Sequence, residues 1–433
     1  MNKKISIIFS LALIIIIQLF YSCRRELPPA HPPAIDSIKV DPFVISKVNF
    51  YFENSASMNG YLTGTNFKQT MHRILGNIEE EKLNSFFVNS AEYKVDNILT
   101  LIDDRNISKG DVGTSDHQFI FTNAIQNVGP DELGMVVTDG IYSVKDGDID
   151  VVGTDIENTF KKALQKNEIE TVVLKLVSEF DGTYYSETCP PGEKAIKIKQ
   201  DRPYYILLFG GKKAINRALE NIAVTQDLPG FKDQARFLLT QYDSLKYSIL
   251  TLGEEVHGKF RKQNKKDVFV QEIKDAQKFT IKGFRNTPKD SIFLQFGIAI
   301  DFSEIELPDS YLTSKLNYKI NKETGFTLED IKVIDNLSAK SKTKKFLDSK
   351  FKKQFTHILV VKAKDNLYGD LIIKLENNLP EWINNTGTSN DCPITDDTQG
   401  TFAFDSLMKG ISEAYKKINN NEAYFGIELK INP

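Results

Sequence analysis

Three oxygen-bearing side chains at alternate positions follow the apolar run at 48–52. Glu53, Ser55 and Ser57 come directly after segment 48–52, whose residues are mostly aromatic or β-branched. A carboxylate and two hydroxyls are hard oxygen donors of the kind that Mg²⁺ and Ca²⁺ prefer, and a short loop lets the backbone curl around the ion. The spacing predicts a divalent-cation site for Mg²⁺, Ca²⁺ or Mn²⁺ at the end of a strand. The alternative is that these side chains only cap the segment that follows.

A second polar motif follows another short apolar run. Thr138, Asp139 and Gly140 come directly after segment 135–137. Ligands of open α/β sheets gather at the carboxyl ends of the strands. We therefore expect Asp139 to lie at the same sheet edge as Glu53, Ser55 and Ser57.

Together these motifs resemble the von Willebrand factor A (vWA) domain, whose metal-ion-dependent adhesion site uses Asp-x-Ser-x-Ser, a Thr and the Asp of a Thr-Asp-Gly. The resemblance covers residues 44–223 and implies a cation site made by Glu53, Ser55, Ser57, Asp139 and a Thr ligand. Thr114 is the first choice for that Thr, and Thr122 is the second. The departure from the family pattern is Glu53, which stands where the family has Asp and whose extra methylene moves the carboxylate outward.

The segments around these motifs predict an α/β fold with a doubly wound, mostly parallel sheet. Short apolar strands alternate with amphipathic helices, which is typical of a sheet covered on both faces. We expect strands at 48–52, 86–88, 135–137, 171–177 and 204–209, with helices between them and after the last. The predicted vWA-like domain spans residues 44–225.

The rest of the chain has a different periodicity. Residues 231–250 look helical, and 226–265 are expected to form a helical connector. In 292–302 apolar residues alternate strictly, which indicates a strand. The pattern predicts a β-rich, sandwich-like C-terminal domain over 266–433, with one late helix at 404–418 whose apolar stripe is a core face.

The N-terminus has the pattern of a bacterial lipoprotein signal. Two lysines precede an apolar run, and Ser22-Cys23 follows it. This predicts a signal peptide over 1–22, lipidation of Cys23 and a proline-rich tether over 23–43. An uncleaved membrane anchor is the alternative. Either one attaches the protein to a membrane of the cell envelope on its extracytoplasmic side, and Arg24-Arg25 favours the periplasm.

Charge and cysteine content limit the remaining interpretations. The formal net charge is −3, so nucleic acid is not an expected partner. Cys189 and Cys392 could form a disulfide in an oxidising compartment or remain separate thiols. The lysine-rich run at 340–353 could contact anionic lipid or simply face solvent.

These observations favour a binding protein that engages a protein partner through a divalent cation. An under-neutralised cation with an open position attracts an acidic group from a partner. A metal-assisted hydrolase with Ser55 or Ser57 as nucleophile is an alternative, in which His117 is the one candidate base. A structural envelope lipoprotein with a degenerate metal site is the other. For His117 itself, a solvent-facing helix position is expected.

Overall fold

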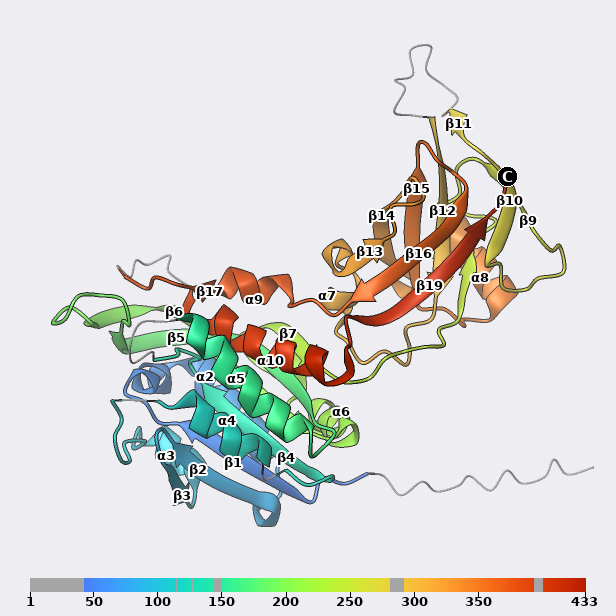
Figure 1. Cartoon of the computed structure of the whole chain (residues 1–433). Coiled ribbons are helices and arrows are strands. Elements are labelled where there is room, and N and C mark those ends of the chain that lie inside the picture. Colours follow the sequence, from blue (N-terminus) through green and yellow to red (C-terminus); the bar gives the residue numbers. More distant parts are fainter. Residues whose placement is uncertain (1–42, 114, 127, 144–148, 281–291, 393–399) are drawn as a thin grey trace, which may run out of the picture. The chain divides into compact units, whose positions relative to one another are not determined.

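Helices cover both faces of a seven-stranded sheet in the computed structural model (Figure 1). The structure describes residues 43–433 except 114, 127, 144–148, 281–291 and 393–399, so the predicted signal, Cys23 and nearly all of the tether lie outside the described residues. The strand order is β3-β2-β1-β4-β6-β5-β7. The strands are β1 (Lys47–Glu53), β2 (Leu83–Val88), β3 (Glu92–Val95), β4 (Glu132–Thr138), β5 (Glu170–Tyr185), β6 (Ala195–Gly210) and β7 (Phe231–Phe237).

Alternation along the central strands divides the apolar side chains between two cores. Phe50 and Phe52 of β1 face one core, and Tyr51 between them faces the other. The first core packs against α2 (Thr65–Gly76), α3 (Ile98–Asp103) and α6 (Lys212–Asn221). The second core packs against α4 (His117–Gln126), α5 (Ile149–Leu164) and α10 (Phe404–Asn419). This arrangement confirms the predicted α/β class.

The sheet is mixed, which corrects the prediction of a mostly parallel one. Strands β2, β1 and β4 are parallel, but β6 runs antiparallel to β4, and β5 and β7 continue that pattern. Residues 186–194 alone join β5 to β6, and parallel strands need a connection of a dozen residues or more. The two strands therefore form a long hairpin, whose polar outer part lies beyond the apolar runs 171–177 and 204–209.

The second half contains two five-stranded sheets that share one core. One sheet has the order β13-β16-β19-β10-β9, and the other has β11-β12-β15-β14 with β8 beside β12. The helix α8 (Lys342–Phe351) covers the outer face of the second sheet. The strands are β8 (Tyr247–Ile249), β9 (Lys259–Lys262), β10 (Glu272–Gln277), β11 (Phe279–Thr280), β12 (Ile292–Ile300), β13 (Tyr318–Ile320), β14 (Phe326–Val333), β15 (His357–Ala363), β16 (Gly369–Glu376) and β19 (Ala423–Ile431).

Smaller elements complete the described chain. Strands β17 and β18 pair with each other. Their bounds, with those of the remaining helices, are β17 (Gly387–Thr388), β18 (Thr401–Phe402), α7 (Asp309–Leu312), α9 (Glu381–Thr386) and the 3-10 helices η1 (Ser57–Thr63), η2 (Glu80–Lys82), η3 (Thr225–Asp227), η5 (Lys315–Asn317) and η6 (Ile334–Asn336). Within the described residues, no helix is both long enough and apolar enough to cross a bilayer.

The predicted domain boundaries need two corrections. Residues 231–237 of the expected helical connector form β7, the edge strand of the first sheet, because Ala235 and Phe237 pack in its core while the intervening side chain is polar. The late helix α10 also packs against α5 of the first half, although β19 after it returns to the second half. The expectation that the apolar stripe of α10 is a core face is confirmed.

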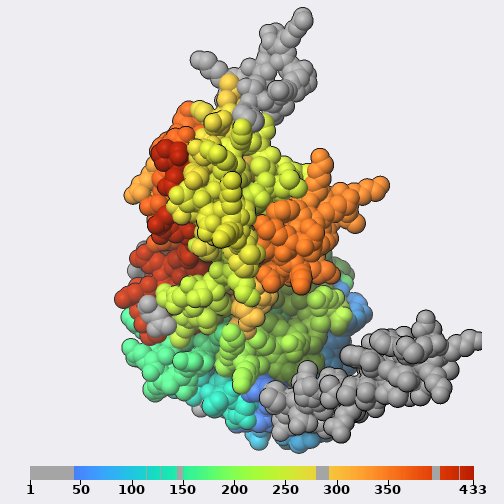
Figure 2. Space-filling model, turned by 90° about the vertical axis from the view of Figure 1, so that its right-hand side faces the viewer, coloured from blue at the N-terminus to red at the C-terminus, as the bar shows by residue number. Residues whose placement is uncertain are grey.

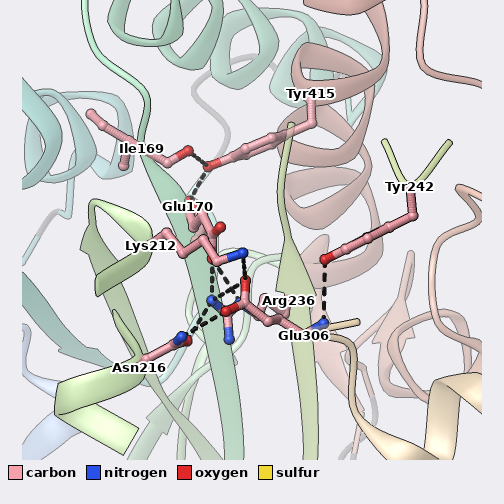
Figure 3. A network of polar contacts seen from close by, with 9 residues as sticks. Ile169, Glu170, Lys212, Asn216, Arg236, Tyr242, Glu306 and Tyr415 are labelled. Atoms are coloured by element: carbon pink, nitrogen blue, oxygen red, sulfur yellow. Dashed lines mark hydrogen bonds and ion pairs between the residues drawn. The ribbon is translucent and has the colours of Figure 1, made fainter. Parts of the chain in front are cut away.

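A buried ion-pair network joins β7 to segments on both sides of it in the chain (Figure 3). The Nε of Arg236 donates to Oε2 of Glu170 at 2.7 Å, and its Nη2 lies 3.3 Å from Oε2 of Glu306. Lys212 Nζ approaches the same Glu306 oxygen at 3.1 Å, and the Asn216 amide donates to Oε1 at 2.6 Å. Arg236 thus balances two carboxylates, one of which lies in the loop between β12 and α7.

We predict that Arg236→Ala destabilises the protein by about 3–5 kcal/mol, because it leaves the Glu170 carboxylate buried without its cation. The measurement is the free energy of unfolding in urea. Arg261→Ala is the matched control: Arg261 pairs with Asp275 at 2.6 Å on the surface and should contribute no more than about 1 kcal/mol. Equal losses in the two variants would contradict a structural role for the network.

Candidate functional site

Two adjacent parallel strands bring the predicted site residues to one sheet edge. Strand β1 lies beside β4 with Phe52 opposite Val137, so Glu53 at the end of β1 lies next to the end of β4. Thr138 is the last residue of β4, and Asp139 follows it. The structure therefore places the two sequence motifs side by side, as the order of the apolar runs predicted.

The loop after β1 is held in place by its backbone and by one buried amide. The Asn54 side chain donates to the carbonyls of Ile107 and Lys109, at 3.1 and 2.8 Å. The backbone N–H of Ala56 donates to the carbonyl of Val112 at 2.8 Å. These bonds tie the loop to the segment before α4, and η1 begins at its end. The hydroxyls of Ser55 and Ser57 consequently lie next to each other.

A chain of hydrogen bonds connects those hydroxyls to Asp139. The Oγ atoms of Ser55 and Ser57 are 3.0 Å apart, and Ser57 donates to Oδ2 of Asp139 at 2.5 Å. The other oxygen, Oδ1, accepts from the backbone N–H of Ile141 at 3.0 Å. Gly140 between them has φ +71, and a side chain there would strike the Tyr205 ring at 2.8 Å, so the tight turn needs glycine.

Glu53 is held by a second set of groups. Its Oε1 accepts from the Ser115 hydroxyl at 2.5 Å, and its Oε2 accepts from the hydroxyl of Thr138. His117 Nε2 lies 3.3 Å from Thr138 Oγ1 and 3.9 Å from Glu53 Oε2. Thr138 donates its single hydroxyl proton to Glu53, so its Oγ1 can only accept from His117. The Nε2 atom of His117 therefore carries a proton and donates it to Thr138.

His117 does not face solvent, which corrects the expectation from sequence. Only 1% of its surface is exposed, because α4 turns this first residue toward the ends of β1 and β4. Its ring stacks on Tyr142 with centroids 5.4 Å apart. Burial lowers the pKa of His117 to about 4, so the imidazole is neutral near pH 7. It therefore cannot neutralise Glu53 at that pH.

The two carboxyl groups are buried with no charge of opposite sign to balance them at neutral pH among the interactions described above. Glu53 is 1% exposed and Asp139 is 2% exposed. Burial, and then the nearby negative charge of Glu53, raise the pKa of Asp139 to about 7. Burial also raises the pKa of Glu53, although the hydrogen bonds from Ser115 and Thr138 oppose that shift. The site thus favours either a proton or a cation between these groups.

A hollow of about 480 Å³ opens over these side chains. Glu53, Ser55, Ser57 and Asp139 all line it. The opposite wall comes from the tip of the β5–β6 hairpin, which contributes the residues Tyr185, Ser186, Glu187 and Lys194. The predicted donors therefore face a space that is open to a ligand.

A disulfide and a buried carboxylate hold the hairpin tip. Cys189 and Cys392 form the disulfide that the sequence left open. The neighbouring Asp391 accepts from the Tyr184 and Ser186 hydroxyls, both at 2.8 Å, and from the backbone N–H of Glu187 at 3.0 Å. Because Ser186 and Glu187 line the hollow, Asp391 fixes the shape of its wall from behind.

The structure brings together most of the predicted ligands. Glu53, Ser55, Ser57 and Asp139 converge, whereas Thr114, the first choice for the Thr ligand, lies outside the described residues. Thr122, the second choice, lies half-buried within α4 and is not among the residues that line the hollow.

Sequence reasoning missed two residues of the site. Ser115 and Thr138 both hold Glu53 by hydrogen bonds. Thr138 ends β4 and Ser115 lies just before α4, and these positions at the end of a strand and before a helix were the available signal.

Comparisons of the chain with protein-family models, with curated proteins and with solved structures found no match in any of the three. Within the described residues, no group of three or more His, Cys, Asp or Glu side chains has the arrangement of a metal site. The predicted site differs from such a group because its two serine hydroxyls equal its two carboxylates in number.

We predict that the free energy of unfolding of the metal-free protein depends on pH because Asp139 titrates. Between about pH 4 and pH 7 the folded state keeps the Asp139 proton while the unfolded chain has lost it, so its stabilising contribution falls as the pH rises. The slope is at most about 1.4 kcal/mol per pH unit. Urea unfolding of the wild type and of Asp139→Asn at several pH values, with a chelator present, measures it. If the two profiles run parallel, Asp139 does not titrate in this range.

Proposed function

We propose that this protein binds an acidic partner protein through a divalent cation, using a vWA-like domain attached to the cell-envelope membrane. Glu53, Ser55, Ser57 and Asp139 would hold the ion, and Mg²⁺, Ca²⁺ and Mn²⁺ are the candidates. The observation that carries the proposal is the chain of contacts from Ser55 through Ser57 to Asp139, which faces an open hollow beside Glu53. The predicted lipid at Cys23 would supply the membrane attachment.

The donor chemistry fits a hard divalent cation. All four side chains present oxygen atoms, and the two that carry charge are buried and have raised pKa values. A buried carboxylate without a counter-charge is unfavourable, and a bound cation would remove that cost by favouring the ionised form. Binding at neutral pH would accordingly release protons from this pair.

The proposed cation site can accommodate Glu53 in place of the Asp of the vWA motif. Its longer side chain reaches the hydroxyls of Ser115 and Thr138, which hold the carboxylate by two hydrogen bonds. The two serine hydroxyls and Asp139 line the hollow beside it. Because Glu53 already accepts two hydrogen bonds, it would neutralise a divalent ion only in part, which favours an acidic side chain from a partner at the open side. Lys194 of the hairpin wall adds a positive charge to the lining of the hollow.

We expect calorimetric titration of the fragment 43–433 to show binding of at least one of Mg²⁺, Ca²⁺ and Mn²⁺, and Asp139→Ala and Ser57→Ala to weaken it at least about tenfold. The fragment contains every hydrophobic core of the described residues and is a compact unit by itself. Asp181→Ala is the control, because Asp181 lies exposed on the hairpin and pairs with Lys199. Absence of binding by the wild type would leave a structural protein with a degenerate site.

The partner can be sought in membranes from the source cells. A pull-down with the wild-type fragment should retain a protein in the presence of the cation that calorimetry identifies, and lose it when a chelator is added. The Asp139→Ala fragment should retain nothing under either condition. A partner that is held equally with and without chelator would separate partner binding from the ion.

One contact favours a second candidate, a hydrolase of ester or phosphoester substrates. Ser57 donates to Asp139, whose pKa of about 7 suits a general base. His117 does not serve this role, since it contacts Thr138 instead. We expect no Ser57-dependent turnover of p-nitrophenyl acetate or p-nitrophenyl phosphate with metal supplied. Turnover that Ser57→Ala and Asp139→Asn both abolish would replace the binding proposal with this one.

A further inference from the structure

Two lysine-rich segments that are far apart in the chain meet on one surface of the second half. Residues 251–270 and 340–353 together contain twelve Lys and Arg but four Asp and Glu, in a chain whose net charge is −3. Figure 2 shows the two segments next to each other on one face, in yellow-green and in orange. We call residues 251–270 and 340–353 the lysine surface.

Side-chain contacts confirm that the two segments touch. The Phe269 ring lies 5.7 Å from the Phe351 ring, and the Glu254 carboxylate accepts from the backbone N–H of Thr343 at 2.9 Å. Lys350 extends over the Phe351 ring at 4.9 Å. Burial, and then the positive charge of Lys262, lower the pKa of Lys350, which is consistent with lysines of both segments being neighbours.

Exposed apolar side chains lie among these charges. Leu252 is 57% exposed, Val268 is 56% exposed and Phe269 is 38% exposed. Of the acidic residues in the two segments, Glu254 is held at the start of α8 and Glu255 is buried and paired with Lys332 at 2.9 Å. The remaining two, Asp267 and Asp348, leave a large excess of positive charge. The surface is therefore both cationic and partly apolar.

From this combination we propose that the lysine surface binds the face of a membrane that contains anionic phospholipid. Lysines are flexible point charges suited to headgroup phosphates, and eleven of the twelve cationic residues are Lys. Leu252, Val268 and Phe269 would enter the boundary between headgroups and acyl chains, as apolar side chains of interfacial proteins do. A purely electrostatic surface for an acidic protein would not require exposed apolar groups among the lysines.

This surface is separate from the cation site in the first half. It would add a second membrane contact to the lipid predicted at Cys23, and stable attachment generally takes two such contacts. It would also hold the folded part close to the bilayer rather than at the end of a free tether. The proposal does not depend on whether Asp139 holds an ion.

Sedimentation of fragment 43–433 with vesicles of phosphatidylglycerol and phosphatidylcholine, or of phosphatidylcholine alone, tests the proposal. We expect binding to the anionic vesicles that weakens as salt is raised. The variant Lys265→Glu, Lys266→Glu, Lys345→Glu changes three exposed lysines and should lower the partition coefficient about 100-fold. The matched control, Lys162→Glu, Lys166→Glu, Lys213→Glu, makes the same charge change on exposed lysines of the first half and should bind nearly as the wild type does.

A second variant tests the apolar part. Leu252→Ser with Val268→Ser should weaken vesicle binding several-fold at a salt concentration where electrostatic attraction is screened. Thermal unfolding checks that each variant is folded.

The proposal is overturned if anionic and neutral vesicles bind equally, or if both lysine variants lose binding equally. It is also overturned if polyglutamate, used as a soluble acidic probe, binds the wild type as tightly as the anionic vesicles do, since the surface would then recognise acidic chains generally.

Discussion

The burial of two carboxyl groups at one sheet edge is the constraint on which the rest of the site depends. Glu53 and Asp139 are almost wholly removed from water, and hydroxyls from Ser57, Ser115 and Thr138 donate to their oxygens. Hydroxyls satisfy the oxygens as hydrogen-bond acceptors but leave the net charge in place. The site is therefore poised to take up positive charge, and the sheet edge positions it to do so.

Asp391, which supports the hairpin wall of the hollow from behind, is a buried carboxyl group with the opposite electrostatic outcome. It is as deeply buried, and burial by itself raises the pKa of its carboxyl group, yet the hydrogen bonds from Thr188, Glu187, Ser186 and Tyr184 outweigh that effect and hold the pKa below its usual range. A carboxylate satisfied in this way is stable as an anion and has no need of a ligand. The contrast with Asp139 separates a residue that supports the hollow from one that faces into it.

The local periodicity of apolar residues predicted many of the strands and helices. Most of the elements that it missed are strands whose pairing the local sequence does not reveal. The strand indicated within 292–302 is β12, and the motifs at 53–57 and 138–140 lie close together because both follow buried strands that neighbour each other. The β5–β6 hairpin was missed because its polar outer part carries no apolar signal. Segment 231–237 looked helical because its partner, β5, lies far back in the chain. Burial of His117 came from the direction in which α4 starts, which no spacing of residues reveals.

The path of the chain between the two halves has a consequence for how the protein is made. The first sheet lacks its edge strand until β7 is synthesised, and one of its two covering layers lacks α10 until residue 419 is available. The second half in turn waits for β19, the strand between β16 and β10. Neither half can therefore complete its core while the ribosome is still adding residues near 400, and the bond between Cys189 and Cys392 must also form late. Both halves are therefore completed by the same segment, α10 with β19, which follows all the strands that it joins in the chain.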